Sequence, residues 1–344
     1  MSSLNRSDLL LAHRYRLSLQ RPPRQSRFRV VALIFLEKES LVDSKNCPPV
    51  LCWDQDRPYL LGTNDEACWI GNSICAERAA LALLRWFPTA KVEKIVIVSD
   101  APHPIAPGCL CREFMASCDQ VPWDVPIILG GAKYQENPEE NLGVEDVTGI
   151  IVTLDYLYPY PSLFLRTCPL DCLAFGQKWY PRLKEFNHSL LRIARTVFEE
   201  EVDDTTNLHP ISYVAVVLFR DKTHAYSSCI KSLEYGCSQD AITQLAPVMS
   251  AKRAQGVEPI QLVQVDQFGI AHPPFAPARA FLVEQQYDHV SVFIHIFEKK
   301  LNTLMWKTIK ASDLAPMTPN YVANLYKEDS CAGEKPIKIQ DVEP

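Results

Sequence analysis

Two segments of this chain each place cysteine where a helix is predicted to begin. Cys75 precedes the stretch 76–84, whose alanines and leucines are strong helix formers with an apolar stripe. The stretch 94–100 is rich in β-branched residues and predicts a buried strand, after which a loop broken by prolines leads to Cys109 and Cys111. The sequence therefore predicts an α/β fold in which two strand-to-helix units bring cysteine to neighbouring helix starts.

Cysteine at a helix start suits metal binding, because the positive end of the helix dipole favours the thiolate. A zinc ion that activates water keeps three protein ligands and an open fourth position, and it lowers the pKa of that water to about 7. Glu77 follows Cys75 by two residues, so its carboxylate can move protons between this water and a departing amine without binding the metal. Arg78 and Arg112 lie beside the candidate ligands and are expected to support them, Arg112 by donating to a thiolate.

These segments resemble the hallmark of nucleoside-type cytidine deaminases, a Cys-Ala-Glu segment followed by a Pro-Cys-x-x-Cys segment. The stretch Cys-Ala-Glu-Arg at 75–78 is a full match. The later segment is a partial match, because one residue instead of two separates Cys109 from Cys111. The resemblance covers about residues 20 to 178 and implies a three-layer α-β-α cytidine deaminase-like fold with a mixed sheet.

The shortened cysteine pair permits two alignments with the family segment. In one, Cys111 takes the place of the family's last cysteine, and Gly108 occupies the earlier ligand position. In the other, Cys109 keeps the family's distance from Asp100, and one residue is missing before Cys111. Because Cys109 is the nearest thiol under either alignment, and glycine permits an altered loop, we predict a zinc site formed by Cys75, Cys109 and Cys111.

The resemblance also implies roles for residues upstream of the first cysteine. Asn64 and Glu66 match the family's asparagine and glutamate that hydrogen-bond the ribose hydroxyls. Phe28 matches a phenylalanine that packs against the pyrimidine ring, and a place in the core is an equal alternative for it. The implied reaction is zinc-dependent hydrolytic deamination of cytidine or deoxycytidine to uridine or deoxyuridine and ammonia, as in pyrimidine salvage, with Glu77 as the catalytic residue.

The second half of the chain repeats the pattern of the first without its chemistry. The apolar stretch 213–219 repeats the first half's opening strand. Aligning the segments that follow puts Gln239 at the proton-carrying position of Glu77, and Phe275 where Cys109 stands. Neither an amide nor an aromatic ring replaces a zinc thiolate, so we expect this copy to hold no metal.

The repeat divides the chain into a catalytic domain at 1–178, a degenerate, non-catalytic domain at 179–327 and a mobile tail at 328–344. Apolar residues at helical spacing predict an opening helix for the second copy within 183–204, equivalent to a helix at 9–19 in the first. Cytidine deaminases occur as small tetramers or as dimers of doubled chains, so the resemblance implies a homodimer.

Composition and charge limit the kinds of ligand and partner that the sequence predicts. The net charge of −6 and the lack of a dense basic stripe favour a free nucleoside over nucleic acid, and a carboxylate at Glu66 near the sugar disfavours a nucleotide. No apolar run has the length of a membrane span. The 12 cysteines form no regular framework and no signal peptide is evident, which predicts a cytoplasmic protein.

Two other functions stay open on the sequence alone. One is a catalytically inactive deaminase-fold scaffold or regulatory partner that has lost metal binding with the shortened cysteine pair. The other is a deaminase that acts on another aminated base or on RNA.

Overall fold

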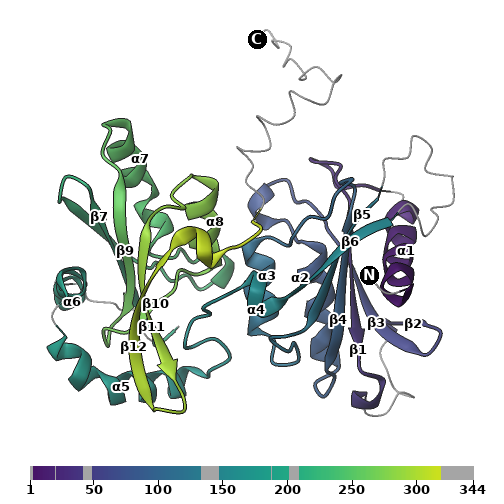
Figure 1. Cartoon of the computed structure of the whole chain (residues 1–344), viewed down its shortest axis with the longest axis horizontal. Helices are drawn as coiled ribbons and strands as arrows, with labels where there is room; N and C mark the ends of the chain where they lie inside the picture. Colours follow the sequence, from purple (N-terminus) through teal and green to yellow (C-terminus); the bar gives the residue numbers. More distant parts are fainter. Residues whose placement is uncertain are drawn as a thin grey trace, which may run out of the picture.

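The chain forms two mixed β-sheets that lie side by side, each with helices on both faces (Figure 1). The structure is a computed structural model. It describes residues 3–19, 21–41, 49–132, 147–186, 188–200 and 209–318, so the predicted tail at 328–344 lies outside the described residues.

The first sheet has the strand order β2-β3-β1-β4-β5-β6. Strands β4 and β5 are parallel, and every other neighbouring pair is antiparallel. Its central strands are buried on both faces because helices cover both sides. The strands are β1 (Val30–Leu36), β2 (Leu51–Asp54), β3 (Arg57–Thr63), β4 (Val92–Ser99), β5 (Pro126–Ala132) and β6 (Val147–Thr153).

Two separate apolar clusters fill the layers of this half. On one face, Leu9 and Ala12 of α1 (Ser3–Ser18) pack against side chains of β1, β4 and β5. On the other face, helices α2 (Ala76–Ala82), α3 (Cys109–Ser117) and α4 (Leu154–Leu157) cover the sheet. Short 3₁₀ turns lie at Lys38–Ser40, Ile70–Asn72 and Leu83–Trp86.

The second sheet repeats this topology with the order β12-β11-β9-β7-β8, and β10 pairs with β9. Strands β9 and β11 are parallel, as β4 and β5 are. The predicted opening helix is confirmed as α6 (Ser189–Glu200), which packs on the outer face as α1 does (Figure 1). The strands are β7 (Tyr213–Phe219), β8 (His224–Ser228), β9 (Pro259–Asp266), β10 (Ala271–His272), β11 (Ser291–Glu298) and β12 (Thr303–Lys310).

The remaining helices complete the second half. Helices α7 (Ala246–Ala254) and α8 (Ala276–Glu284) cover the inner face of its sheet, and α5 (Pro169–Glu185) links the two halves. Short 3₁₀ turns lie at Tyr235–Cys237, Thr243–Leu245 and Ala311–Leu314. The predicted fold class, a three-layer α/β arrangement with a mixed sheet that occurs twice in one chain, is therefore confirmed. The exact domain boundaries stay a prediction.

The strand pairing defines which residues of the two halves are equivalent. An isolated bridge joins Asp65 to Ile74 in the first half, and the same bridge joins Ile230 to Gln239 in the second. Asp240 therefore takes the place of Cys75, and the predicted equivalence of Gln239 and Glu77 is wrong. Gln239 lies instead in the strand-like approach to the turn.

Helices α3 and α8 meet between the two sheets (Figure 1). One buried arginine from each helix ties the halves together. Arg112 and Arg279 are equivalent, since each donates its Nε–H to the proline carbonyl just before its helix. Nη1 of Arg112 and both Nη groups of Arg279 donate to carbonyl groups that follow the last strand of either sheet, those of Leu157, Pro316, Pro159, Tyr160 and Leu314. The starts of both helices are therefore fixed by the packing of one half on the other.

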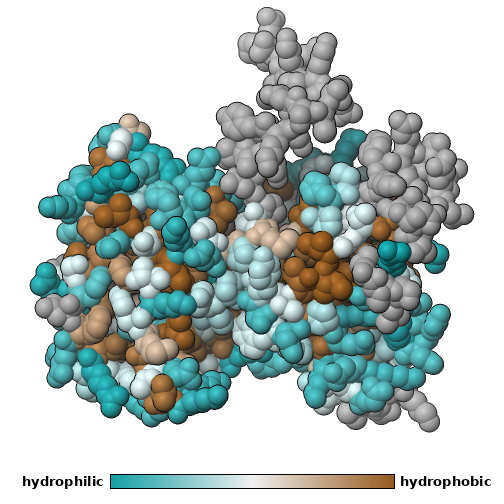
Figure 2. All heavy atoms as spheres, in the orientation of Figure 1, coloured by the Kyte–Doolittle hydropathy of each residue, from teal (hydrophilic) through white to brown (hydrophobic). Residues whose placement is uncertain are grey.

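Within the described residues, none of the helices combines the length and the apolar character needed to cross a bilayer. On the face drawn in Figure 2, apolar side chains reach the surface over both halves, between hydrophilic ones. Large exposed apolar residues include Trp69, Trp86, Leu170 and Leu233.

Candidate metal centre and active site

Cys75 and Glu77 are positioned by the start of α2, as the sequence predicts. Cys75 is the N-cap residue with extended backbone, and Glu77 lies in the first helical turn and is buried. Helix α2 lies so close to β3 that a Cβ added at Gly62 would come within 2.2 Å of the Ala76 carbonyl oxygen. Only glycine at 62 permits this approach, which fixes the height of α2 over the sheet.

Helix α3 positions the second cysteine segment. Its two thiols do not both point toward Cys75. Gly108 is the N-cap and Cys109 the first helical residue. An α-helix turns about 100° per residue, so side chains at 108 and 111 share a face while those at 109 and 111 point in nearly opposite directions. This geometry explains why the family segment separates its cysteines by two residues.

Of Cys109 and Cys111, only Cys111 lies close to Cys75. One ligand atom each of Cys75, Glu77 and Cys111 lies within 4.8 Å of the others. Among the residues that the structure describes, no other group of three cysteine, histidine or carboxylate side chains converges in this way.

Cys109, predicted as the third ligand, lies elsewhere. It is buried in the contact between α3 and α8, where it packs against Ala276 and Ala315. Its Sγ lies 3.8 Å from Oγ1 of Thr318. The prediction that Cys109 meets Cys75 and Cys111 is not met, because one residue of helical rotation turns its thiol toward the second half.

The three converging donors fit a zinc ion by their chemistry. Zinc is held in proteins by cysteine sulfur and by carboxylate oxygen as well as by histidine, and sites that do chemistry keep three protein ligands. Two thiols and one carboxylate make such a set. The set differs from the predicted three thiols, since Gly108 stands at the position that faces the cluster from the start of α3. It also includes Glu77, which the sequence predicts to carry protons without binding the metal.

Interactions within the cluster shift the pKa values of the two thiols in opposite directions. A hydrogen bond from the Cys111 thiol, helped by the Arg78 guanidinium, lowers the pKa of Cys75 to about 6. The same hydrogen bond, with burial, raises the pKa of Cys111. Burial, together with the nearby Cys75 thiolate, raises the pKa of the Glu77 carboxyl to about 7. One thiolate and a carboxyl that titrates near neutrality are typical of a site built for metal binding or proton transfer.

The two arginines beside the cluster differ in their contacts. Arg78 donates to the Ser73 carbonyl at 3.1 Å and to the Cys75 sulfur at 3.7 Å, so it supports the thiolate directly. Arg112 was expected to donate to a thiolate. It donates instead to carbonyl oxygens, among them that of Pro107 at 2.7 Å, and so holds the start of α3 in place.

A cavity of about 320 Å³ opens over this cluster. Cys75, Glu77 and Gly108 line it from the two helix starts. Its other walls include the three residues predicted to bind substrate, Phe28, Asn64 and Glu66.

The two polar residues of that wall already have partners in the chain. Asn64 accepts from the Val30 N–H and donates to the Phe28 carbonyl, both at 2.8 Å. Glu66 accepts from the backbone of Gln25 and Ser26 and from the Ser26 hydroxyl. An amide and a carboxylate each have capacity for further hydrogen bonds. Both residues therefore shape the wall and still offer polar atoms to it.

Gly108 is the residue of this site whose place the sequence left open between two alignments. A Cβ added there would meet no atom within 4 Å. Its backbone angles, φ −66° and ψ 162°, suit any residue. The first alignment, with Gly108 at the earlier ligand position, agrees with the helix start, and the phase of α3 is the signal that selects it.

The structure has likenesses among solved cytidine deaminases. The enzyme from Burkholderia pseudomallei matches with a TM-score of 0.30 and 20% identity, over 46% of this chain and 98% of its own. That from Mycobacterium leprae matches with a TM-score of 0.28 and 16% identity, over 37% of this chain and 95% of its own. That from Mycobacterium tuberculosis gives 0.27 and 17%, over 36% and 89%. Scores and identities this low do not establish a family. No protein-family model and no curated protein sequence matches the chain.

Proposed function

We propose that the first half is a zinc-dependent nucleoside deaminase, and that it hydrolyses cytidine or deoxycytidine to the uracil nucleoside and ammonia. The observation that carries this proposal is the convergence of Cys75, Glu77 and Cys111 beside a cavity with an aromatic and a polar wall. The cavity is at the lower end of the size range of small-molecule sites, which suits one nucleoside.

Cys75, Cys111 and Glu77 would hold the metal, and the metal would supply an activated water at neutral pH. Glu77 has two oxygens, so it can contact an ion through one and exchange a proton through the other. Burial raises the pKa of Glu77 to about 7 without a metal, and a bound zinc ion would lower it again, so Glu77 would meet the attacking water as a carboxylate. Glu77 would take the proton of the attacking water and deliver protons to the ring nitrogen and the leaving amine.

The remaining walls position the substrate. Phe28 offers an apolar face to a pyrimidine ring, and Asn64 and Glu66 offer polar atoms to the sugar hydroxyls. Holding the base still beside the reacting groups contributes to the rate without any chemistry of its own. The carboxylate of Glu66 would repel a phosphate on the sugar, so a free nucleoside is the expected substrate.

A second candidate function, a metal-free deaminase-fold scaffold, is favoured by Gly108. With glycine at the position that faces the cluster, the site has two thiols where the family pattern has three. Such a protein would bind a partner or a nucleoside and release no ammonia.

Metal content and ammonia release measured on the same purified protein separate the two. The deaminase proposal predicts zinc in the wild-type chain, ammonia release from cytidine, and loss of both in Cys75→Ser. Glu77→Gln should abolish ammonia release while the fold is kept, as followed by the thermal unfolding midpoint. Wild-type protein that retains no zinc and releases no ammonia would establish the scaffold instead.

Homodimer formation and a cytoplasmic location accompany this proposal as predictions. Sedimentation of the full chain tests the first, and imaging of the tagged protein tests the second.

A further inference from the structure

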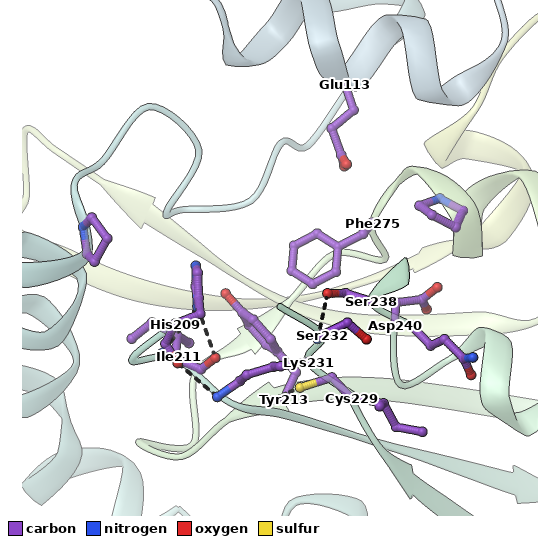
Figure 3. A pocket seen from close by; sticks show the side chains of 14 residues that line it. Glu113, His209, Ile211, Tyr213, Cys229, Lys231, Ser232, Ser238, Asp240 and Phe275 are labelled. Carbon is purple, nitrogen blue, oxygen red and sulfur yellow. Dashed lines mark hydrogen bonds between the residues drawn. The ribbon is translucent and has the colours of Figure 1, made fainter. Parts of the chain in front are cut away.

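The second half contains a larger cavity than the first, about 570 Å³, at the equivalent place in the repeat. It lies where β7, the end of β8 and the start of α8 meet, as the proposed active-site cavity lies among β1, the end of β3 and the start of α3. Figure 3 shows side chains from these elements pointing into it, with Glu113 reaching down from α3 of the first half.

The catalytic positions of this cavity are filled by residues that do no deaminase chemistry. Asp240 replaces Cys75, but its carboxylate accepts from the N–H groups of Ile242 and Thr243 at 3.0 Å and caps the turn that follows. Phe275 takes the N-cap position of Gly108, and Ala278 takes that of Cys111. The cavity is therefore suited to binding and not to hydrolysis.

The wall equivalent to the proposed sugar-binding wall has reversed its charge. Lys231 follows the bridge residue Ile230, as Glu66 follows Asp65 in the first half. The ammonium of Lys231 donates to the His209 carbonyl and the Ser212 hydroxyl, both at 2.8 Å. Glu66 holds the equivalent loop by accepting hydrogen bonds from it. A phosphate group, which Glu66 would repel, is therefore attracted by Lys231 at this wall.

The lining separates into two ends with aromatic rings between them. Lys231 and His209 lie at one end in Figure 3, and Ser238 and Asp240 lie at the other. Tyr213 and Phe275, whose ring centroids are 5.0 Å apart, stand between these ends. A ligand that fills the cavity would carry an anionic group at one end of a flat ring and hydrogen-bond donors at the other.

We propose that this second cavity binds a nucleoside monophosphate, with its phosphate toward Lys231 and His209 and its base beside Tyr213 and Phe275. The exocyclic amino group of the base would donate its N–H groups to the oxygens of Ser238 and Asp240. The inference does not depend on the proposed deaminase activity, because it uses none of the residues of the first cavity.

Calorimetric titration of the full chain with cytidine and adenosine monophosphates, the two parent nucleosides and inorganic phosphate tests the proposal. Either monophosphate is expected to bind at least about tenfold more tightly than its nucleoside or phosphate alone. Lys231→Met should remove that preference. Lys299→Met, which changes an exposed lysine of the β11–β12 turn outside the cavity, should keep it.

Because Lys231 also holds a loop, a measurement on the unaltered protein accompanies the variant. Cys229 lines the second cavity, whereas Cys118, at the end of α3, lines neither this cavity nor the proposed active-site cavity. The monophosphate should slow alkylation of Cys229 and leave that of Cys118 unchanged.

Titration in the Cys75→Ser background distinguishes the two cavities. Binding that survives this change and protects Cys229 supports the second cavity, whether or not the wild-type protein releases ammonia. Failure of both monophosphates to bind, or binding that is lost in Cys75→Ser and leaves Cys229 unprotected, would overturn the proposal.

Discussion

Replacing Gly108 with cysteine should strengthen metal binding by the Cys75–Glu77–Cys111 cluster. The substitution puts a thiol at the N-cap of α3, three residues before Cys111 and therefore on the same face of the helix. A Cβ at 108 meets nothing within 4 Å, and φ is −66°, so the side chain enters without strain. Loss of glycine's freedom in the unfolded chain adds roughly 0.4–1 kcal/mol of stability.

The size of the effect follows from the contribution of one ligand. Structural zinc sites with four ligands provide roughly 10–16 kcal/mol, so a further thiolate contributes about 3 kcal/mol. That corresponds to a Kd for zinc lowered by about a hundredfold. The gain requires Cys75, Cys111 and residue 108 to face one ion.

Competition with a chromophoric chelator measures the zinc affinity of wild-type protein and variant. Gly236→Cys is the matched control, since a Cβ there also meets nothing within 4 Å but lies in the second half. The control should leave the zinc affinity of the cluster unchanged. Equal zinc affinity in wild type and Gly108→Cys would show that residue 108 does not face the ion, although the helix phase turns Cys109 away from it.

Further predictions concern packing, the helix phase and acid stability. Cys109→Ala should keep the bound zinc and Cys111→Ala should lose it, as elemental analysis of the purified variants will show. Gly62→Ala should lower the free energy of unfolding by about 1–3 kcal/mol, because its Cβ would overlap the Ala76 carbonyl of α2, and urea unfolding measures this. Burial lowers the pKa of His13 from 6.5 to about 4, so the unfolded chain binds its proton first as the pH falls. Stability present above pH 6.5 should fall by about 3 kcal/mol towards pH 4, and His13→Asn, unfolded in urea at both pH values, should lose that share of the pH dependence.

Local pattern was sufficient for the elements that carry the site. The β-branched run before Ser99 forms β4, and the alanine-rich run after Cys75 forms α2 with Cys75 as N-cap. Both depend on neighbours in sequence, which propensity and capping describe well. The repeat was visible for the same reason, because its apolar strands recur in order.

The predictions that are wrong concern features that depend on residues far away in the sequence, or on which residue begins a helix. The face on which Cys109 lies depends on which residue begins α3, and its burial depends on α8, more than 160 residues later. The predicted equivalence of Gln239 and Glu77 is wrong because Gln239 pairs with Ile230 across the bridge. No helix-forming run like the one after Cys75 marks the turn in the second half. The carbonyl partners of Arg112 lie in both halves, so no local pattern could have predicted them.

Anomalous diffraction at the zinc edge, from crystals of the full chain grown with zinc, locates the ion itself. We expect a zinc peak bound by the sulfurs of Cys75 and Cys111 and a carboxylate oxygen of Glu77. A map without a peak at these three side chains, or with the ion at Cys109, would show that this cluster is not the metal centre.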